Sequence, residues 1–113
     1  MVKLVNRAKM TTTTVGTGTL TLGTASNGYQ SFAAAGVLNG DEVRYVIEDG
    51  VNWEIGSGIY TASGTTLTRN VTESSNSNSA LNLSGNAEVF VSAVAEDFGS
   101  AGKSIAVSLI FGG

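Results

Sequence analysis

Apolar and polar side chains alternate with a period of two along most of the chain, and turn residues interrupt the alternation at short intervals. In residues 17–23, leucine and threonine fall on opposite faces, which is typical of a half-buried strand. Residues 43–48 show the same alternation and are followed by Asp49 and Gly50. An Asp-Gly pair favours a tight hairpin, because a type I′ turn needs a positive φ at both central positions.

The residues after this turn are expected to form the return strand. Val51, Trp53 and Ile55 fall on one of its faces, and Gly56 and Gly58 are expected to end it. The alanines at 33–35 are expected to lie in a loop of at most one helical turn, and residues 73–79 in an exposed polar loop. Other expected strands cover residues 2–6, 11–14, 59–62, 65–71, 80–84 and 88–94.

Short strands at this spacing predict an all-β fold, either a small antiparallel β-sandwich or a jelly-roll-like barrel of about eight or nine short strands. Residues 1–94 are expected to form this β-sandwich module, and residues 95–102 a flexible linker rich in small residues. Residues 103–113 then form an apolar strand. That strand either completes the fold of its own chain, which we favour, or adds to an edge of a neighbour. Its candidate interface residues are Ile105, Val107, Leu109 and Phe111.

The amino-acid composition excludes more classes of function than the alternation of apolar and polar residues does. The 113 residues include no cysteine and no histidine, which excludes disulfides and thiolate metal sites and removes the commonest general base. No nucleophile has a neighbouring base, so we expect no enzyme and no cofactor. Charged residues make up only 13% of the chain, against about a quarter in ordinary domains. Association with other copies is therefore the expected route to additional buried surface.

The net charge of −3 argues against a nucleic-acid partner, which needs a basic stripe. The basic residues Lys3, Arg7 and Lys9 cluster near the N-terminus and are interpreted as a docking arm or a solvated strand face. No apolar stretch reaches the roughly 18 residues of a membrane helix. The N-terminal residues lack the apolar core of a signal peptide, so we expect a protein made and used without export, and without a membrane partner.

Two sets of residues are candidates for ligand chemistry. The acids at 41–42 and 48–49, with Glu54 nearby, would serve glycoside hydrolysis only in a cleft holding two of them about 5 to 9 Å apart, and their places beside turn glycines favour a role in turns. Trp53, Tyr45 and Tyr60 would be able to stack on sugars, although packing is the usual role of so few aromatic residues.

An ordered series of motifs resembles a β-module of structural proteins in tailed phages and prophages. The resemblance covers residues 6–92 and starts with the threonine-rich run 6–22. Its further matches are Gly28, Tyr29 and Phe32; Gly40, Asp41, Val43 and Tyr45; Asp49, Gly50, Trp53, Glu54, Gly56, Gly58, Tyr60 and Thr61; and Leu67 and Arg69. Residues 102–112 also resemble the C-terminus of phage fibre-type proteins.

The resemblance implies a virion protein of the tail or fibre apparatus, assembled in the bacterial cytoplasm. Because the module is nearly the whole chain here, we expect an adaptor or a short appendage subunit rather than a long fibre. Its partners would be copies of itself, with trimers as the expected order, and other virion proteins. The alternatives are a capsid decoration protein and a module that binds carbohydrate on the host surface.

Overall fold

The computed structural model describes residues 2–93, in which nine strands and one short helix follow one another along the chain. The elements are β1 (Lys9–Thr12), β2 (Val15–Gly16), β3 (Leu20–Ala25), α1 (Phe32–Ala35), β4 (Glu42–Asp49), β5 (Asn52–Thr61), β6 (Thr66–Leu67), β7 (Asn70–Ser74), β8 (Leu83–Ser84) and β9 (Ala87–Val91). The predicted all-β class is confirmed.

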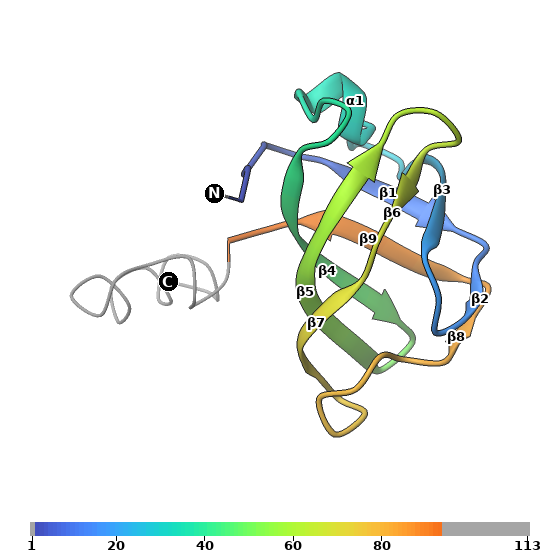
Figure 1. Cartoon of the computed structure of the whole chain (residues 1–113). Coiled ribbons are helices and arrows are strands. Elements are labelled where there is room, and N and C mark those ends of the chain that lie inside the picture. The colour runs from blue at the N-terminus through green and yellow to red at the C-terminus, as the bar shows by residue number, and fades with distance from the viewer. Residues whose placement is uncertain (1, 94–113) are drawn as a thin grey trace, which may run out of the picture.

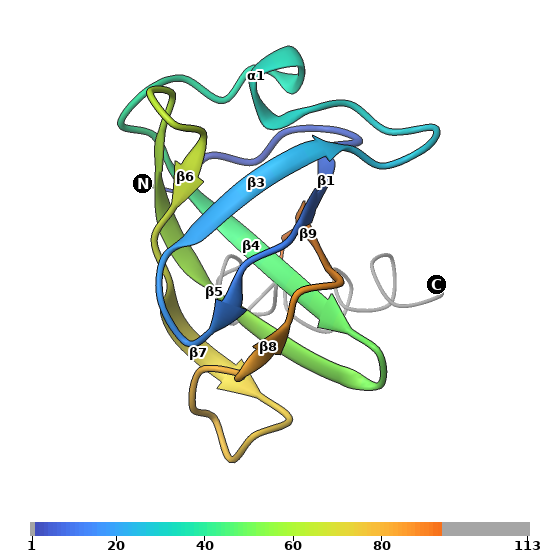
Figure 2. The same ribbon diagram turned by 90° about the vertical axis from the view of Figure 1, so that its right-hand side faces the viewer.

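Six of the strands form a closed antiparallel barrel (Figures 1 and 2). The order around the ring is β4-β9-β1-β3-β6-β5, and the β4–β5 hairpin closes it. Strand β7 pairs with the first half of β5, whereas β6 pairs with its end. Strands β2 and β8 form a separate two-stranded sheet near the end of the barrel that lies opposite α1. Of the two predicted architectures, the chain therefore adopts a barrel.

Helix α1 closes one end of the barrel, where a loop was expected. The Ser31 hydroxyl accepts a hydrogen bond from the Ala34 N–H, and Gly36 ends the helix in the left-handed conformation. The Phe32 side chain is completely buried, with its ring centroid 6.2 Å from that of Tyr60. The four-residue helix thus exists because it is capped at both ends and anchored by one aromatic side chain.

Strand β5 differs most from the sequence-based expectation. It continues without interruption through Gly56 and Gly58, which were expected to end it. A Cβ atom at Gly58 would collide with the Thr68 carbonyl oxygen, and one at Gly56 with the Tyr45 hydroxyl. The two glycines therefore permit close packing inside the barrel instead of breaking the strand.

The face of β5 that carries Trp53 and Ile55 is the outer one. Val51 in the hairpin turn is 94% exposed and Trp53 is 37% exposed, whereas Glu54 is completely buried. The inward-facing positions of β5 are Glu54, Gly56, Gly58 and Tyr60. The face with the fewest apolar side chains points into the barrel, because a buried cation neutralises Glu54 there.

Other boundaries follow the prediction closely. The Asp49–Gly50 hairpin is confirmed, with Gly50 at φ 66°. The expected strand at 65–71 is divided into β6 and β7, and β7 extends to Ser74, so the exposed loop starts later than predicted. At the N-terminus only Lys3 forms a bridge, with Val43, where a strand at 2–6 was expected. The predicted linker and terminal strand lie outside the described residues.

Candidate functional site

A buried ion pair lies at the end of the barrel opposite α1. The Glu54 side chain on β5 has no exposed surface, and the Arg69 side chain, between β6 and β7, is 2% exposed. Arg69 donates hydrogen bonds to both carboxylate oxygens, from Nε to Oε2 at 3.1 Å and from Nη2 to Oε1. The Tyr45 hydroxyl donates to Oε2 at 2.6 Å, and the Leu81 N–H donates to Oε1 at 2.9 Å. The carboxylate is therefore fully satisfied without water.

The remaining donors of Arg69 bind the backbone where strand pairing is missing. Strands β3 and β6 pair over only two residues each, and no pairing joins β3 to β7 within the described chain. In this gap Arg69 Nη1 donates to the carbonyl oxygens of Gly16 and Gly18, each at 3.2 Å. Its Nη2 atom donates to the Leu81 carbonyl oxygen at 2.9 Å. One planar guanidinium group thus binds Glu54 on β5, the segment at Gly16 and Gly18, and the backbone at Leu81, and so reinforces the short β2–β8 pairing.

Acid is expected to destabilise the barrel through this site. Burial raises the pKa of Glu54, but hydrogen bonds from Arg69, Tyr45 and the Leu81 N–H outweigh it and hold the pKa below its ordinary value of 4.5. The contribution of the ion pair is therefore complete above the unfolded pKa and is lost as the pH falls through the lower folded pKa. We expect the melting temperature, followed by circular dichroism, to fall between about pH 6 and pH 3.

The variant Glu54→Gln provides the control for this pH dependence. It should start from a lower melting temperature and lose less on acidification, because position 54 no longer titrates. Asp41 and Glu88 also have lowered pKa values. Both carboxylates are partly exposed, whereas Glu54 is buried, so their contribution should be smaller and Asp41→Asn should keep most of the acid sensitivity. An equal loss in the parent and in Glu54→Gln would contradict the assignment.

Two of the three predicted basic interface residues lie together. The Arg7 guanidinium lies 4.0 Å from the centre of the Tyr29 ring, and Lys9 Nζ lies 5.1 Å from the same ring and 5.5 Å from that of Phe90. Lys9 is also 3.6 Å from a carboxylate oxygen of Glu88. Stacking on aromatic rings fixes both cations on the outer surface of the barrel.

Lys3 lies apart from the other two basic residues. Its ammonium group is 3.0 Å from Asp41, whose carboxylate also accepts a hydrogen bond from the Leu38 N–H at 2.7 Å. Asp41 therefore has a role in a turn, and with Lys3 it fastens the N-terminal segment to the start of β4. The four candidate interface residues of the C-terminal strand, Ile105, Val107, Leu109 and Phe111, lie outside the described residues.

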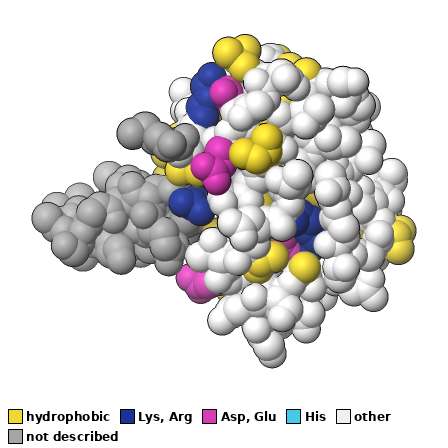
Figure 3. Space-filling model, in the orientation of Figure 1, with side chains coloured by type: hydrophobic (Ala, Val, Ile, Leu, Met, Phe, Trp, Pro, Cys, Tyr) yellow, Lys and Arg dark blue, Asp and Glu magenta, His cyan; other side chains and the backbone are white. Residues whose placement is uncertain are grey.

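The stacking role considered for two of the aromatic residues is wrong. Tyr45 is completely buried and Tyr60 is 4% exposed, so neither ring is accessible to a ligand. Tyr45 instead donates its hydroxyl to Glu54, and Tyr60 packs against Phe32. Trp53 is on the outer surface and is 37% exposed. The face shown in Figure 3 is mostly uncharged, with scattered hydrophobic side chains.

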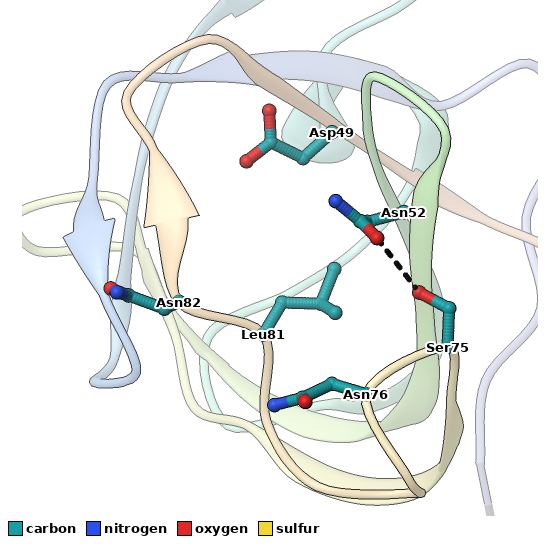
Figure 4. Close-up of a pocket in the computed structure, with 6 residues that line it drawn as sticks. All are labelled: Asp49, Asn52, Ser75, Asn76, Leu81 and Asn82. Atoms are coloured by element: carbon teal, nitrogen blue, oxygen red, sulfur yellow. Dashed lines mark hydrogen bonds between the residues drawn. The ribbon is translucent and has the colours of Figure 1, made fainter.

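A pocket of about 210 Å³ opens beside the buried ion pair (Figure 4). The β4–β5 hairpin lines one part of it, and the loop between β7 and β8 lines the rest, with the turn after β7 and the residues before β8. Figure 4 shows Leu81 in the middle, with Asp49 and Asn52 on one side and Asn76 on the other. The lining residues are Asp49, Asn52, Ser75, Asn76, Leu81 and Asn82.

The sequence offered little indication of this pocket. Asp49 was considered only as a turn residue or as one of the paired acids, and residues 73–79 only as a polar loop. The glycines at 56 and 58 were interpreted as the end of the strand, although their spacing in phase with Glu54 also fits a crowded inner face. Arg69 was one of the matched motif residues. An acid in phase with these glycines needs a cation to neutralise it, and this requirement is the signal that points to a pairing of Glu54 with Arg69.

Within residues 2–93, no group of three or more acidic, histidine or cysteine side chains is placed to hold a metal ion. In the same range, no helix has the length and apolar character required to cross a membrane. Compared with known proteins, the chain matches no family model, no curated protein and no solved structure.

Proposed function

We propose that the chain is a structural subunit of a tailed-phage particle that acts in multiple copies. Within the particle, it serves as an adaptor or short appendage of the tail or fibre apparatus. The observation that carries the proposal is the ordered series of motifs across residues 6–92. Three polar residues of this series support a structural role, because Tyr45 and Arg69 both donate hydrogen bonds to Glu54 inside the barrel. Residues that resemble those of the phage module therefore hold a rigid unit together.

The proposed assembly surface is on the outside of the barrel. Strand register aligns Phe90, Val46 and Ile55 across β9, β4 and β5. All three are half-buried, and their sequence neighbours on each strand point into the core. Trp53 lies on the same outer face, two residues before Ile55 on β5. Together these four residues, here called the outer stripe, form an apolar strip on a sheet face that also carries Lys9, Glu48 and Glu88 beside it.

The proposed occupant of the outer stripe is the apolar segment 103–113 of a neighbouring copy. The six strands of the barrel ring lie within residues 9–91, so the ring closes without a strand from this segment. The described chain leaves β9 next to the outer stripe, where Val91 pairs with Tyr45 of β4. An alternating segment presents its apolar residues on one side, which matches an apolar sheet face.

Aspartate substitutions in the terminal segment test this mode of assembly. Sedimentation of the full chain is expected to show an oligomer, and the double variant Val107→Asp, Leu109→Asp is expected to sediment as a folded monomer. Val51→Asp is the matched control, because Val51 is 94% exposed in the hairpin turn, and it should leave the oligomer intact. A monomeric parent, or a double variant that unfolds, would count against docking by this segment.

The location of the protein is tested on purified particles. Mass spectrometry should detect the chain in phage particles whose genome encodes it, and antibody labelling should place it at the tail by electron microscopy. Labelling of the head would support capsid decoration instead. Its absence from washed particles would overturn the proposal.

A further inference from the structure

We propose that the pocket between the β4–β5 hairpin and the residues before β8 binds a single neutral sugar ring. This proposal is independent of the virion role, because it depends only on the six lining residues. The pocket volume of about 210 Å³ is below the roughly 300 to 1,000 Å³ of sites for drug-sized ligands. A pocket of this size suits one ring of an oligosaccharide rather than a large ligand.

The pocket is rigid because its walls are already hydrogen-bonded. The Leu81 backbone at its floor donates to Glu54 and accepts from Arg69. Both carboxylate oxygens of Asp49 accept hydrogen bonds from Ser84, from the N–H at 2.9 Å and from the hydroxyl at 2.7 Å. A site held in this way loses little conformational entropy when a ligand binds.

The turn after β7 is fixed in the same manner. Asn76 donates its amide to the Ala80 carbonyl oxygen at 3.2 Å, and the Ser75 hydroxyl accepts a hydrogen bond from the Trp53 N–H at 3.0 Å. The buried ion pair and these side-chain hydrogen bonds thus position three otherwise separate segments around one space.

The hydrogen-bonding capacity left in the pocket matches the hydroxyl groups of a sugar, since each carboxylate oxygen of Asp49 has one hydrogen bond to Ser84 and a second lone pair to offer. Asn52 accepts a hydrogen bond from Ser75 through its amide oxygen at 3.4 Å, and its amide nitrogen points toward the side of Asp49 in Figure 4. That N–H₂ is a donor, whereas Asp49 supplies only acceptors. A sugar hydroxyl both donates and accepts, so neighbouring hydroxyls can bind Asn52 and Asp49 together. The Leu81 side chain offers an apolar contact for the carbon-bound hydrogens of the ring.

Charge excludes the other simple ligand classes. An anion would find no cation among the lining residues and would face the carboxylate of Asp49. A calcium ion needs six to eight oxygen ligands, several of them usually carboxylates, and the pocket has one acid that is already hydrogen-bonded twice. A neutral ligand with several hydroxyl groups fits both the charge and the mixture of donors and acceptors.

Nuclear magnetic resonance titration of the full chain tests the proposal. Glucose, galactose, mannose and N-acetylglucosamine are added separately to ¹⁵N-labelled protein. At least one is expected to shift the amide signals of Leu81 and Ser84 and the side-chain amide of Asn52. The variant Asn52→Ala should weaken binding of that sugar by about tenfold, because one donor is lost.

Asn27→Ala is the matched control, since Asn27 lies in an exposed turn outside the pocket, and it should bind the sugar like the parent. The proposal is overturned if none of the four sugars shifts these signals, or if Asn52→Ala binds as tightly as the parent. It is also overturned if calcium chloride shifts them and the sugars do not. None of these outcomes bears on the particle experiments above.

Discussion

Replacing Arg69 with methionine is expected to lower the free energy of unfolding by about 3–5 kcal/mol, as for other buried ion pairs that lose one partner. The substitution leaves the Glu54 carboxylate buried without its cation. It also removes the donors to the carbonyl oxygens of Gly16, Gly18 and Leu81. Urea denaturation followed by tryptophan fluorescence measures the loss, since Trp53 is the only tryptophan of the chain.

Two variants make this result specific to the buried site. Arg7→Met removes an exposed arginine that stacks on Tyr29, and it should cost no more than about 1 kcal/mol. Arg69→Lys keeps the charge but loses the planar array of donors, so an intermediate loss is expected even if the methionine variant does not fold. A loss at Arg69→Met as small as that at Arg7→Met would show that the ion pair does not hold the barrel together.

Gly58→Ala is expected to destabilise the barrel by about 3 kcal/mol, at the upper end of the penalties for overpacking. The added methyl group would collide with the backbone carbonyl oxygen of Thr68 and would also lie 3.1 Å from Leu67. Neither the backbone of Thr68, whose N–H is hydrogen-bonded to the Ile59 carbonyl oxygen, nor a completely buried leucine can move aside cheaply. The same denaturation experiment measures the effect.

Gly18→Ala is the control for Gly58→Ala. No atom lies within 4 Å of a Cβ added at Gly18, and its φ is not in the left-handed region. Its free energy of unfolding should change by no more than about 0.5 kcal/mol. If the two alanine variants were equally stable, strand β5 would have to be further from β6 and β7 than the structure places it.

Local patterns predicted the parts of the fold that depend on neighbouring residues. The Asp49–Gly50 hairpin and the alternation in β4 were identified because turn geometry and side-chain periodicity are local properties. The interior face of β5 was not, because the assumption of an apolar core fails where Glu54 is buried. Its partner Arg69 comes from a different strand connection, and periodicity does not identify such a partner.

The pocket was beyond prediction for a related reason. Its residues come from the hairpin near position 50 and from the loop at 75–82, which lie side by side only once β5 pairs with β7. The order of the polar loop depends on side-chain contacts such as Asn78 Oδ1 accepting from the Ser74 N–H. Composition marks such a loop as exposed and polar, and it does not reveal which of its amides face a common space.

The two ends of the described chain meet on one strand. The Lys3 N–H donates to the Glu42 carbonyl oxygen, and the Ser92 N–H donates to the Arg44 carbonyl oxygen two residues further along β4. Figure 1 shows both ends on the same side of the barrel. Domains whose ends lie close together tolerate insertion into other proteins. A longer polypeptide can therefore carry this barrel within a surface loop, because the two connections to the barrel would lie next to each other.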